Sequence, residues 1–176
     1  VLGDGSINPE CLEIYEYVKS CGYAHLSINT NGGARATDFW KELAKLGVEV
    51  IFSIDGLEDT NHLYRRNVKW DRLMNNVEAF MSAGGTANWD FLIFKHNEHQ
   101  IDEAKQLAES MGFRAFRTKA TSRFDHNPDT GLEPPTNYTF EMKDKEFVCY
   151  VEEEKSVYLS AEGIWYPCCW THATHA

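Results

Sequence analysis

Apolar and polar positions follow a repeated order along residues 1–118: an apolar run, a polar turn, an amphipathic stretch and then a glycine. The clearest apolar run is VEVIFSID, from Val48 to Asp55, followed by a loop to Arg66. A near-continuous apolar run of this length is typical of a strand buried on both faces of a parallel sheet. The same reasoning predicts strands over three more ranges: Ala24–Thr30, Asn88–Phe94 and Phe113–Thr118.

Between these strands, apolar residues recur at helical spacing, and glycines at positions 22, 47, 84 and 112 end the stretches. We predict helices over Pro9–Cys21, Thr37–Leu46, Trp70–Phe80 and Glu98–Met111. Asn8 and Asn97 are the expected N-caps of the first and last of these helices. Alternating strands and helices predict an α/β fold of βαβ units with a parallel sheet and right-handed crossovers.

The pattern changes after residue 119. Residues 120–145 hold three prolines and a glycine and read as a linker. Beyond it we predict short antiparallel strands, with a turn at Glu162–Gly163, over Phe147–Tyr150, Ser156–Ala161 and Ile164–Tyr166. The expected units are therefore a barrel-type unit (1–119), a linker (120–145) and a small β-hairpin module (146–176). Val1-Leu2-Gly3 resembles the end of a strand, so we expect a chain cut from a longer protein.

The composition narrows the function classes. The 176 residues are 43% hydrophobic, which is enough for one domain with a core, and the net charge is -10. A chain this acidic is a poor non-specific binder of nucleic acid or of anionic membranes. No apolar run approaches the roughly 20 residues that a membrane span needs. No signal peptide opens the sequence. Five cysteines, an odd count, favour cytoplasmic thiols, some of them metal ligands, over disulfides.

Three successive predicted strands end in polar turns: Gly3-Asp4-Gly5, Thr30-Asn31-Gly32 and Ser53-Ile54-Asp55-Gly56. The carboxyl ends of parallel strands share one edge of a sheet, and α/β folds bind their ligands there. We therefore expect one ligand site lined by the turn backbones and by Asp4, Thr30, Asn31, Ser53 and Asp55. The loop after the third turn adds His62, Arg65 and Arg66, which suit an anionic or carboxylate ligand.

These turns, with His62 and Arg65, resemble the radical S-adenosylmethionine (SAM) enzymes. In that family a Gly-Gly-Glu-Pro segment binds the amino group of SAM. Gly3, Asp4 and Gly5 align with it, and Asp4 supplies the nearby carboxylate because the family's acidic position is Gly5 here. The resemblance also implies that Ser53 and either Arg65 or Arg66 hold the SAM carboxylate.

The resemblance implies a partial (β/α)6 TIM-like barrel in a parent enzyme, an oxidoreductase or maturase. That parent would cleave SAM to a 5′-deoxyadenosyl radical, and the radical would abstract hydrogen from a substrate, often a peptide. The family's Cys-x3-Cys-x2-Cys motif for its [4Fe–4S] cluster is absent from this sequence. We therefore expect the chain alone to be inactive. Its exposed sheet edge could be covered by a second copy in a homo-oligomer.

The C-terminal cysteines extend the resemblance. Cys149 is followed after 13 residues by Gly163 and after four more by Cys168, as at the start of a SPASM or twitch module, which binds an auxiliary iron–sulfur cluster. Cys169 is a further candidate ligand. A structural zinc site, built from these thiols with His172 or His175 in a non-catalytic α/β module, stays open as the alternative. A phosphate-binding α/β domain ranks last, because no glycine-rich phosphate loop is present.

Overall fold

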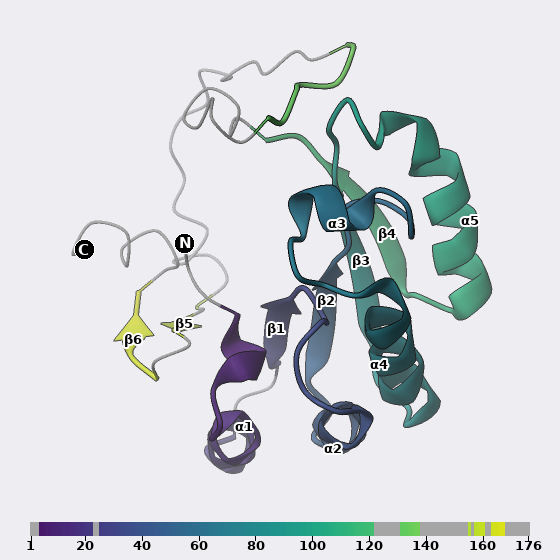
Figure 1. The fold of residues 1–176 in the computed structure, drawn as a ribbon. Coiled ribbons are helices and arrows are strands. Elements are labelled where there is room, and N and C mark those ends of the chain that lie inside the picture. Colours follow the sequence, from purple (N-terminus) through teal and green to yellow (C-terminus); the bar gives the residue numbers. More distant parts are fainter. Residues whose placement is uncertain are drawn as a thin grey trace.

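The computed structural model describes residues 4–22, 25–121, 131–137, 155, 157–160 and 163–167. Its centre is a four-stranded sheet whose spatial order follows the sequence: β1 (Ser27–Thr30), β2 (Glu49–Ser53), β3 (Ala87–Leu92) and β4 (Ala115–Lys119). All three neighbouring pairs are parallel (Figure 1). The predicted α/β fold with a parallel sheet is therefore confirmed.

Helices join the strands as the glycine spacing predicts. They are α1 (Cys11–Ser20), α2 (Thr37–Lys45), α3 (Asn61–Tyr64), α4 (Trp70–Ser82) and α5 (Ile101–Met111), with short 3-10 turns η1 (Gly5–Ile7) and η2 (Glu98–Gln100). The predicted last helix thus starts as a 3-10 turn. The expected cap by Asn97 is wrong, because its side chain bonds other loop atoms instead of the helix end. The expected cap by Asn8 is also wrong, because α1 starts at Cys11 with Glu10 in the N-cap position; the Asn8 side chain accepts a 2.8 Å bond from the Glu10 amide before the helix.

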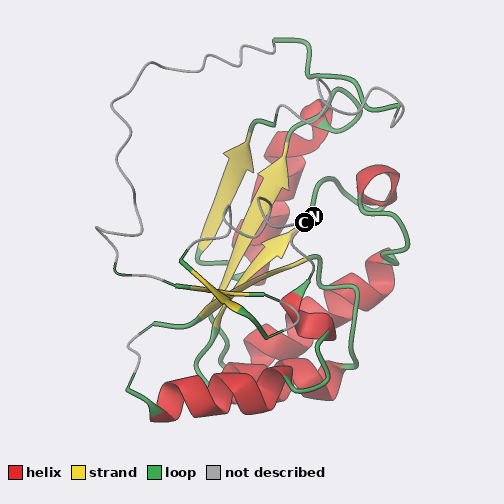
Figure 2. Ribbon diagram, turned by 90° about the vertical axis from the view of Figure 1, so that its left-hand side faces the viewer, coloured by secondary structure: helices red, strands yellow, loops and turns green. Residues whose placement is uncertain are grey.

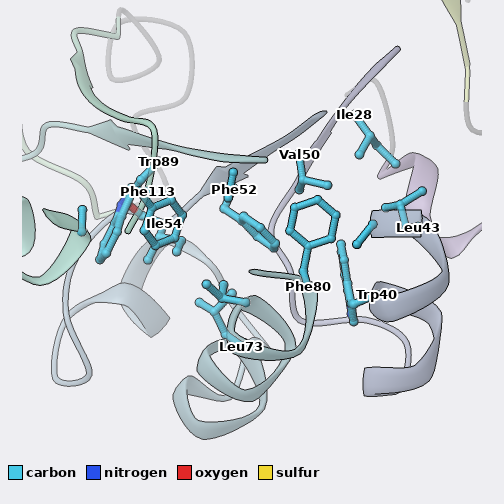
Figure 3. Packing of buried hydrophobic residues seen from close by; sticks show 14 of the residues in the cluster. Ile28, Trp40, Leu43, Val50, Phe52, Ile54, Leu73, Phe80, Trp89 and Phe113 are labelled. Carbon is cyan, nitrogen blue, oxygen red and sulfur yellow. The ribbon is translucent and has the colours of Figure 1, made fainter. Parts of the chain in front are cut away.

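The hydrophobic core lies between the sheet and α2 and α4 (Figure 3). Phe52 of β2 is fully buried at its centre, with ring centroids 5.5 Å from Trp40, 6.0 Å from Phe80 and 6.2 Å from Phe113. Leu73 of α4 is equally buried. Each such side chain contributes roughly 1.5–3 kcal/mol through its burial, so this packing fixes which face of each strand turns towards the helices.

The opposite face of the sheet is polar. Since strand side chains alternate, Phe52 points to the helices and Ser53 points away. The pairing register places Asp90 beside Ser53 and Arg117 beside Asp90. We call this the inner face, made of Ser27, Asn29, Glu49, Ile51, Ser53, Asn88, Asp90, Leu92, Ala115, Arg117 and Lys119. In Figures 1 and 2 the helices gather on the other side of the sheet, so β2 is buried on one face and only half-buried on the inner one.

A separate two-stranded antiparallel hairpin pairs β5 (Tyr158–Leu159) with β6 (Trp165–Tyr166). Its turn residue Gly163 has φ 82°, as a tight turn requires. The hairpin predicted near Gly163 is confirmed with shorter strands. The predicted strand at 147–150 lies outside the described residues, as does most of the predicted linker. Within the described part of the chain, no helix is long and apolar enough to cross a membrane.

The amino-terminal edge of the sheet carries a buried carboxylate, Glu49, that bonds His25 at 2.7 Å and also bonds Arg114 and Asn88. Burial alone would raise the pKa of Glu49. The hydrogen bonds from His25, Arg114 and Asn88 outweigh it, so this pKa lies below its usual value of 4.5. A carboxyl whose pKa is depressed by folding stabilises the protein above its unfolded pKa and loses that effect in acid.

We therefore expect Glu49→Gln to lower the free energy of unfolding at pH 7 by about 1.5–3 kcal/mol, the usual contribution of a hydrogen bond to a charged group. The difference from the parent chain should shrink as the pH falls below 4.5, because the parent then becomes protonated too. Urea denaturation at pH 7 measures the loss of stability, and the same experiment at pH 3.5 shows whether the difference shrinks. Glu42→Gln, which breaks an exposed pair with Lys45, is the control and should cost under about 0.5 kcal/mol. Equal effects of the two variants would contradict this account of Glu49.

Candidate functional site

The polar turns meet at the carboxyl edge of the sheet. Thr30 pairs with Phe52, and Ser53 pairs with Asp90, in parallel register, so the turns that follow β1 and β2 leave the same edge. The Asp4–Gly5 turn is bonded to the end of β1. We call this edge, with the backbones of these turns, the rim.

Asp4 joins the first turn to the second. One carboxylate oxygen accepts from the Ser6 amide at 3.0 Å and the Ser6 hydroxyl at 2.6 Å. The other accepts from the Thr30 hydroxyl at 2.8 Å and the Asn31 amide at 3.0 Å. Four bonds match the acceptor capacity of a carboxylate, so Asp4 fixes the backbone of Gly5 against the end of β1. Gly3, the other predicted residue of this turn, lies outside the described residues.

The Asn31–Gly33 turn is braced from both sides. Its own Asn31 side chain accepts from the Gly33 amide at 2.9 Å, and Asn76 of α4 donates to the Gly32 carbonyl at 2.8 Å. Gly32 has φ 68°, and a Cβ there would lie 2.5 Å from the Leu73 side chain. The glycine is needed because α4 packs closely against this turn, which holds the Asn31 backbone rigidly at the rim.

Asp55 is fully buried and holds Arg65 in place. Its carboxylate accepts from Arg65 Nε at 2.6 Å and from the Leu92 amide at 2.6 Å, which ties the ends of β2 and β3 together. The Arg65 side chain is 22% exposed and lies over the Tyr64 ring, 5.0 Å from its centroid. Within the described part of the chain, neither Nη atom of Arg65 has a bonded partner. This half of the guanidinium is suited to a carboxylate ligand.

The other predicted residues are less closely tied to this cluster. Ser53 is half-buried on the inner face, and its hydroxyl makes no hydrogen bond to any described residue. Arg66 is exposed, and His62 is exposed and lines a hollow beside α4. The structure therefore places Arg65, and not Arg66, against the strand ends.

Two hollows of about 400 and 510 Å³ lie beside the amino ends of α4 and α2. The first is lined by Asn61, His62 and Lys69 among others, and the second by Arg35, Arg72 and Asn76 among others. None of the five side chains expected to line the ligand site borders either hollow.

Sequence reasoning missed the buried amides that position the rim. Asn61 accepts from the Asp55 amide at 2.9 Å, and Asn97 donates to the Asp55 carbonyl at 2.8 Å. Asn76 braces the neighbouring turn as described above. One signal was present for Asn76: it sits within the apolar stripe of α4, where a polar residue needs a bonded partner. Asn61 starts the short helix α3 and Asn97 lies in a loop, and neither carries such a signal.

The described residues do not supply a metal centre. No group of three His, Cys, Asp or Glu residues gathers among them. Cys11 is buried, and burial raises the pKa of its thiol to about 11, so it is a core residue. Cys21 is exposed and lies about 15 Å further along the helix axis. The predicted ligands Cys149, Cys168 and Cys169, with His172 and His175, lie outside the described residues.

Comparison with known proteins gives a family. A model of the radical SAM superfamily matches residues 1–109. Streptococcus suis SuiB bound to S-adenosylmethionine is similar over 94% of this chain and 47% of its own, at 14% identity and TM-score 0.62. SuiB bound to precursor peptide SuiA is similar over 99% and 49%, at 14% identity and TM-score 0.64. The anSMEcpe protein with bound AdoMet is similar over 62% and 32%, at 15% identity and TM-score 0.52.

These structural matches show the shared fold, a radical SAM type partial barrel. The chain spans less than half of the length of each of these three solved structures. Among curated proteins, no match to the sequence is found.

Proposed function

Because this chain belongs to the radical SAM superfamily, we propose that its rim is the SAM-binding edge of a longer radical SAM enzyme. The observation that carries the proposal lies at the carboxyl edge, where Asp55 holds Arg65 and where Ser53 ends β2 with a hydroxyl that bonds no described residue. A guanidinium and a hydroxyl can both donate hydrogen bonds to an amino-acid carboxylate, which accepts them. The family resemblance and the SAM-bound solved structures of the same fold support this choice of ligand.

The residues present fit the amino-acid part of SAM. We assign the SAM carboxylate to Ser53 and Arg65, and the amino group to the backbone of the turn that Asp4 positions. Thr30 and Asn31 hold that turn to β1, and Asp55 orients Arg65. In this superfamily SAM supplies the radical that abstracts hydrogen from the substrate. The described residues offer no set of ligands for the [4Fe–4S] cluster that this chemistry needs, so we expect the chain alone to be inactive.

We propose a peptide as substrate class, in keeping with the similarity to SuiB bound to precursor peptide SuiA. We also propose that Cys149, Cys168 and Cys169 begin an auxiliary cluster module, in a protein of the cytoplasm where thiols stay reduced. Metal analysis separates this from the zinc alternative. One zinc per chain after aerobic purification, lost in Cys168→Ser, would favour zinc.

The test of the proposed function is anaerobic reconstitution of the full-length protein that contains this chain with iron and sulfide. Reductive cleavage of SAM to 5′-deoxyadenosine is the expected result. A protein that binds no cluster and never forms 5′-deoxyadenosine would refute the proposal.

Arg65→Gln should weaken SAM binding about tenfold or more, because a charge-assisted bond to the carboxylate is lost. Arg66→Gln removes the same charge one residue later and should leave the affinity within about twofold. Isothermal titration of SAM into the parent chain and both variants measures this. A larger loss in Arg66→Gln than in Arg65→Gln would reverse the assignment.

A further inference from the structure

The inner face carries a second charged cluster, outside the residues assigned to SAM. The Asp90 carboxylate accepts from Arg117 Nε at 2.6 Å and lies 2.5 Å from Lys119 Nζ. Asp90 is only 5% exposed, whereas the side chains of Arg117 and Lys119 are 45% and 52% exposed. Two cations thus share one buried carboxylate, which leaves the cluster with one excess positive charge in a chain of net charge -10.

The register places this cluster next to Ser53. Ser53 pairs with Asp90, and Asp90 pairs with Arg117, so the three form one row across β2, β3 and β4. Lys119 follows Arg117 by two residues and therefore lies on the same face of β4, one step nearer the rim. Within the described part of the chain, the helices that cover the sheet lie on its other face (Figures 1 and 2). A molecule lying against the inner face beside Ser53 would meet both cations.

Arg117 is held in place with part of its hydrogen-bonding capacity unused. Its Nε is bonded to Asp90, and neither Nη atom has a partner among the described residues. A guanidinium anchored in this way presents a planar pair of donors to a carboxylate without losing further side-chain freedom. Lys119 adds a point charge beside it. The Asp90 carboxylate thus positions the two cations, and the side chains of Arg117 and Lys119 stay about half exposed.

We propose that Arg117 and Lys119, positioned by Asp90, bind a carboxylate of the substrate, so that the substrate is an acidic peptide. This deepens the proposed function and rests on it, since it places the substrate on the inner face next to SAM. A carboxylate fits better than a neutral amide, because only an anion balances the excess charge of the cluster.

Arg114 offers a matched control. It directly precedes β4, its side chain is 57% exposed, and it also bonds a buried carboxylate, Glu49. That pair lies at the opposite, amino-terminal edge, and Glu49 receives two more hydrogen bonds, from His25 and Asn88. Arg114→Gln removes the same charge three residues before Arg117 while leaving the proposed subsite intact.

The test uses two blocked peptides, acetyl-Gly-Glu-Gly-amide and acetyl-Gly-Gln-Gly-amide, which differ only in one carboxylate. Each is titrated into the chain while NMR follows the arginine Nε–Hε signals. We expect the Glu peptide to shift the Arg117 signal and the Gln peptide to leave it in place. Arg117→Gln should weaken Glu-peptide binding about tenfold and Lys119→Gln severalfold, with Arg114→Gln unchanged. Equal shifts with both peptides, no shift with either, or equal weakening by Arg114→Gln would overturn the proposal.

SAM titrated into the same samples separates the two proposals. Arg117→Gln should keep the response to SAM while losing the response to the Glu peptide. If SAM fails to bind but the Glu peptide still shifts Arg117, the proposed function fails and the anion subsite stands without its role in substrate binding. If SAM binds and the Glu peptide does not, the subsite alone is refuted.

Discussion

Asp55→Asn is expected to lower the free energy of unfolding by about 3 kcal/mol, the lower end of the effect of removing one partner from a buried ion pair. Asp55 is fully buried, and its carboxylate bonds both Arg65 and the Leu92 amide. An Asn side chain can still accept from the Leu92 amide. It cannot balance the charge of Arg65, so a guanidinium that is only 22% exposed loses its counter-charge.

Urea denaturation at neutral pH measures this loss, which is a large part of the 5–15 kcal/mol that stabilises a typical domain. Asp38→Asn is the matched control, because Asp38 forms an exposed pair with Lys41 and its side chain is 90% exposed. That change should cost under about 0.5 kcal/mol. Similar losses in the two variants would show that Asp55 is not the anchor of the rim.

Gly56→Ala should be similarly costly, at about 3 kcal/mol, because strain and a steric clash add together. Gly56 has φ 144°, a conformation that residues with a side chain rarely adopt. A Cβ at this position would lie 2.2 Å from Thr60 Oγ1 and 2.9 Å from the Asn61 backbone nitrogen. Thr60 and Asn61 are buried and bonded to their neighbours, so they cannot move aside without disturbing the loop that carries Arg65.

Gly84→Ala separates the cost of backbone strain from the cost of the steric clash. Gly84 also has a positive φ, 88°, but a Cβ there would meet no atom within 4 Å. We expect about 1 kcal/mol for strain alone. Thermal and urea unfolding of both variants gives the difference, which measures the clash. Equal losses of stability in Gly84→Ala and Gly56→Ala would contradict a steric clash in the loop after β2.

The sheet was predictable from the sequence because its signals are local. The apolar run before Ser53 and the glycine at position 112 follow directly from strand burial and helix ending. The rim was predictable in outline for the same reason, since polar turns follow strands that must be parallel. The ion pair of Asp55 with Arg65 joins two predicted site residues, but no pattern predicted that Asp55 would be buried.

The features that the sequence did not predict depend on contacts between residues that lie far apart in the chain. Asn97 looked like a helix cap, whereas in the fold its amide is used by the Asp55 carbonyl, 42 residues earlier in the chain. Asp4 looked like a ligand-binding carboxylate, yet its four bonds run to Ser6, Thr30 and Asn31. The pairing of Asp90 with Arg117 follows from the strand register, and a single sequence does not specify that register.

We expect the amino-acid end of SAM to bind at the joined ends of β1 and β2. Backbone amide NMR of the chain, titrated with SAM to millimolar concentration, tests this most directly. We predict that the signals of Gly5, Asn31, Ser53 and Arg65 move together, while those of His25 and Arg114 at the opposite edge stay in place. Signals that do not move, or that move only beside the hollows at the amino ends of α2 and α4, would contradict it.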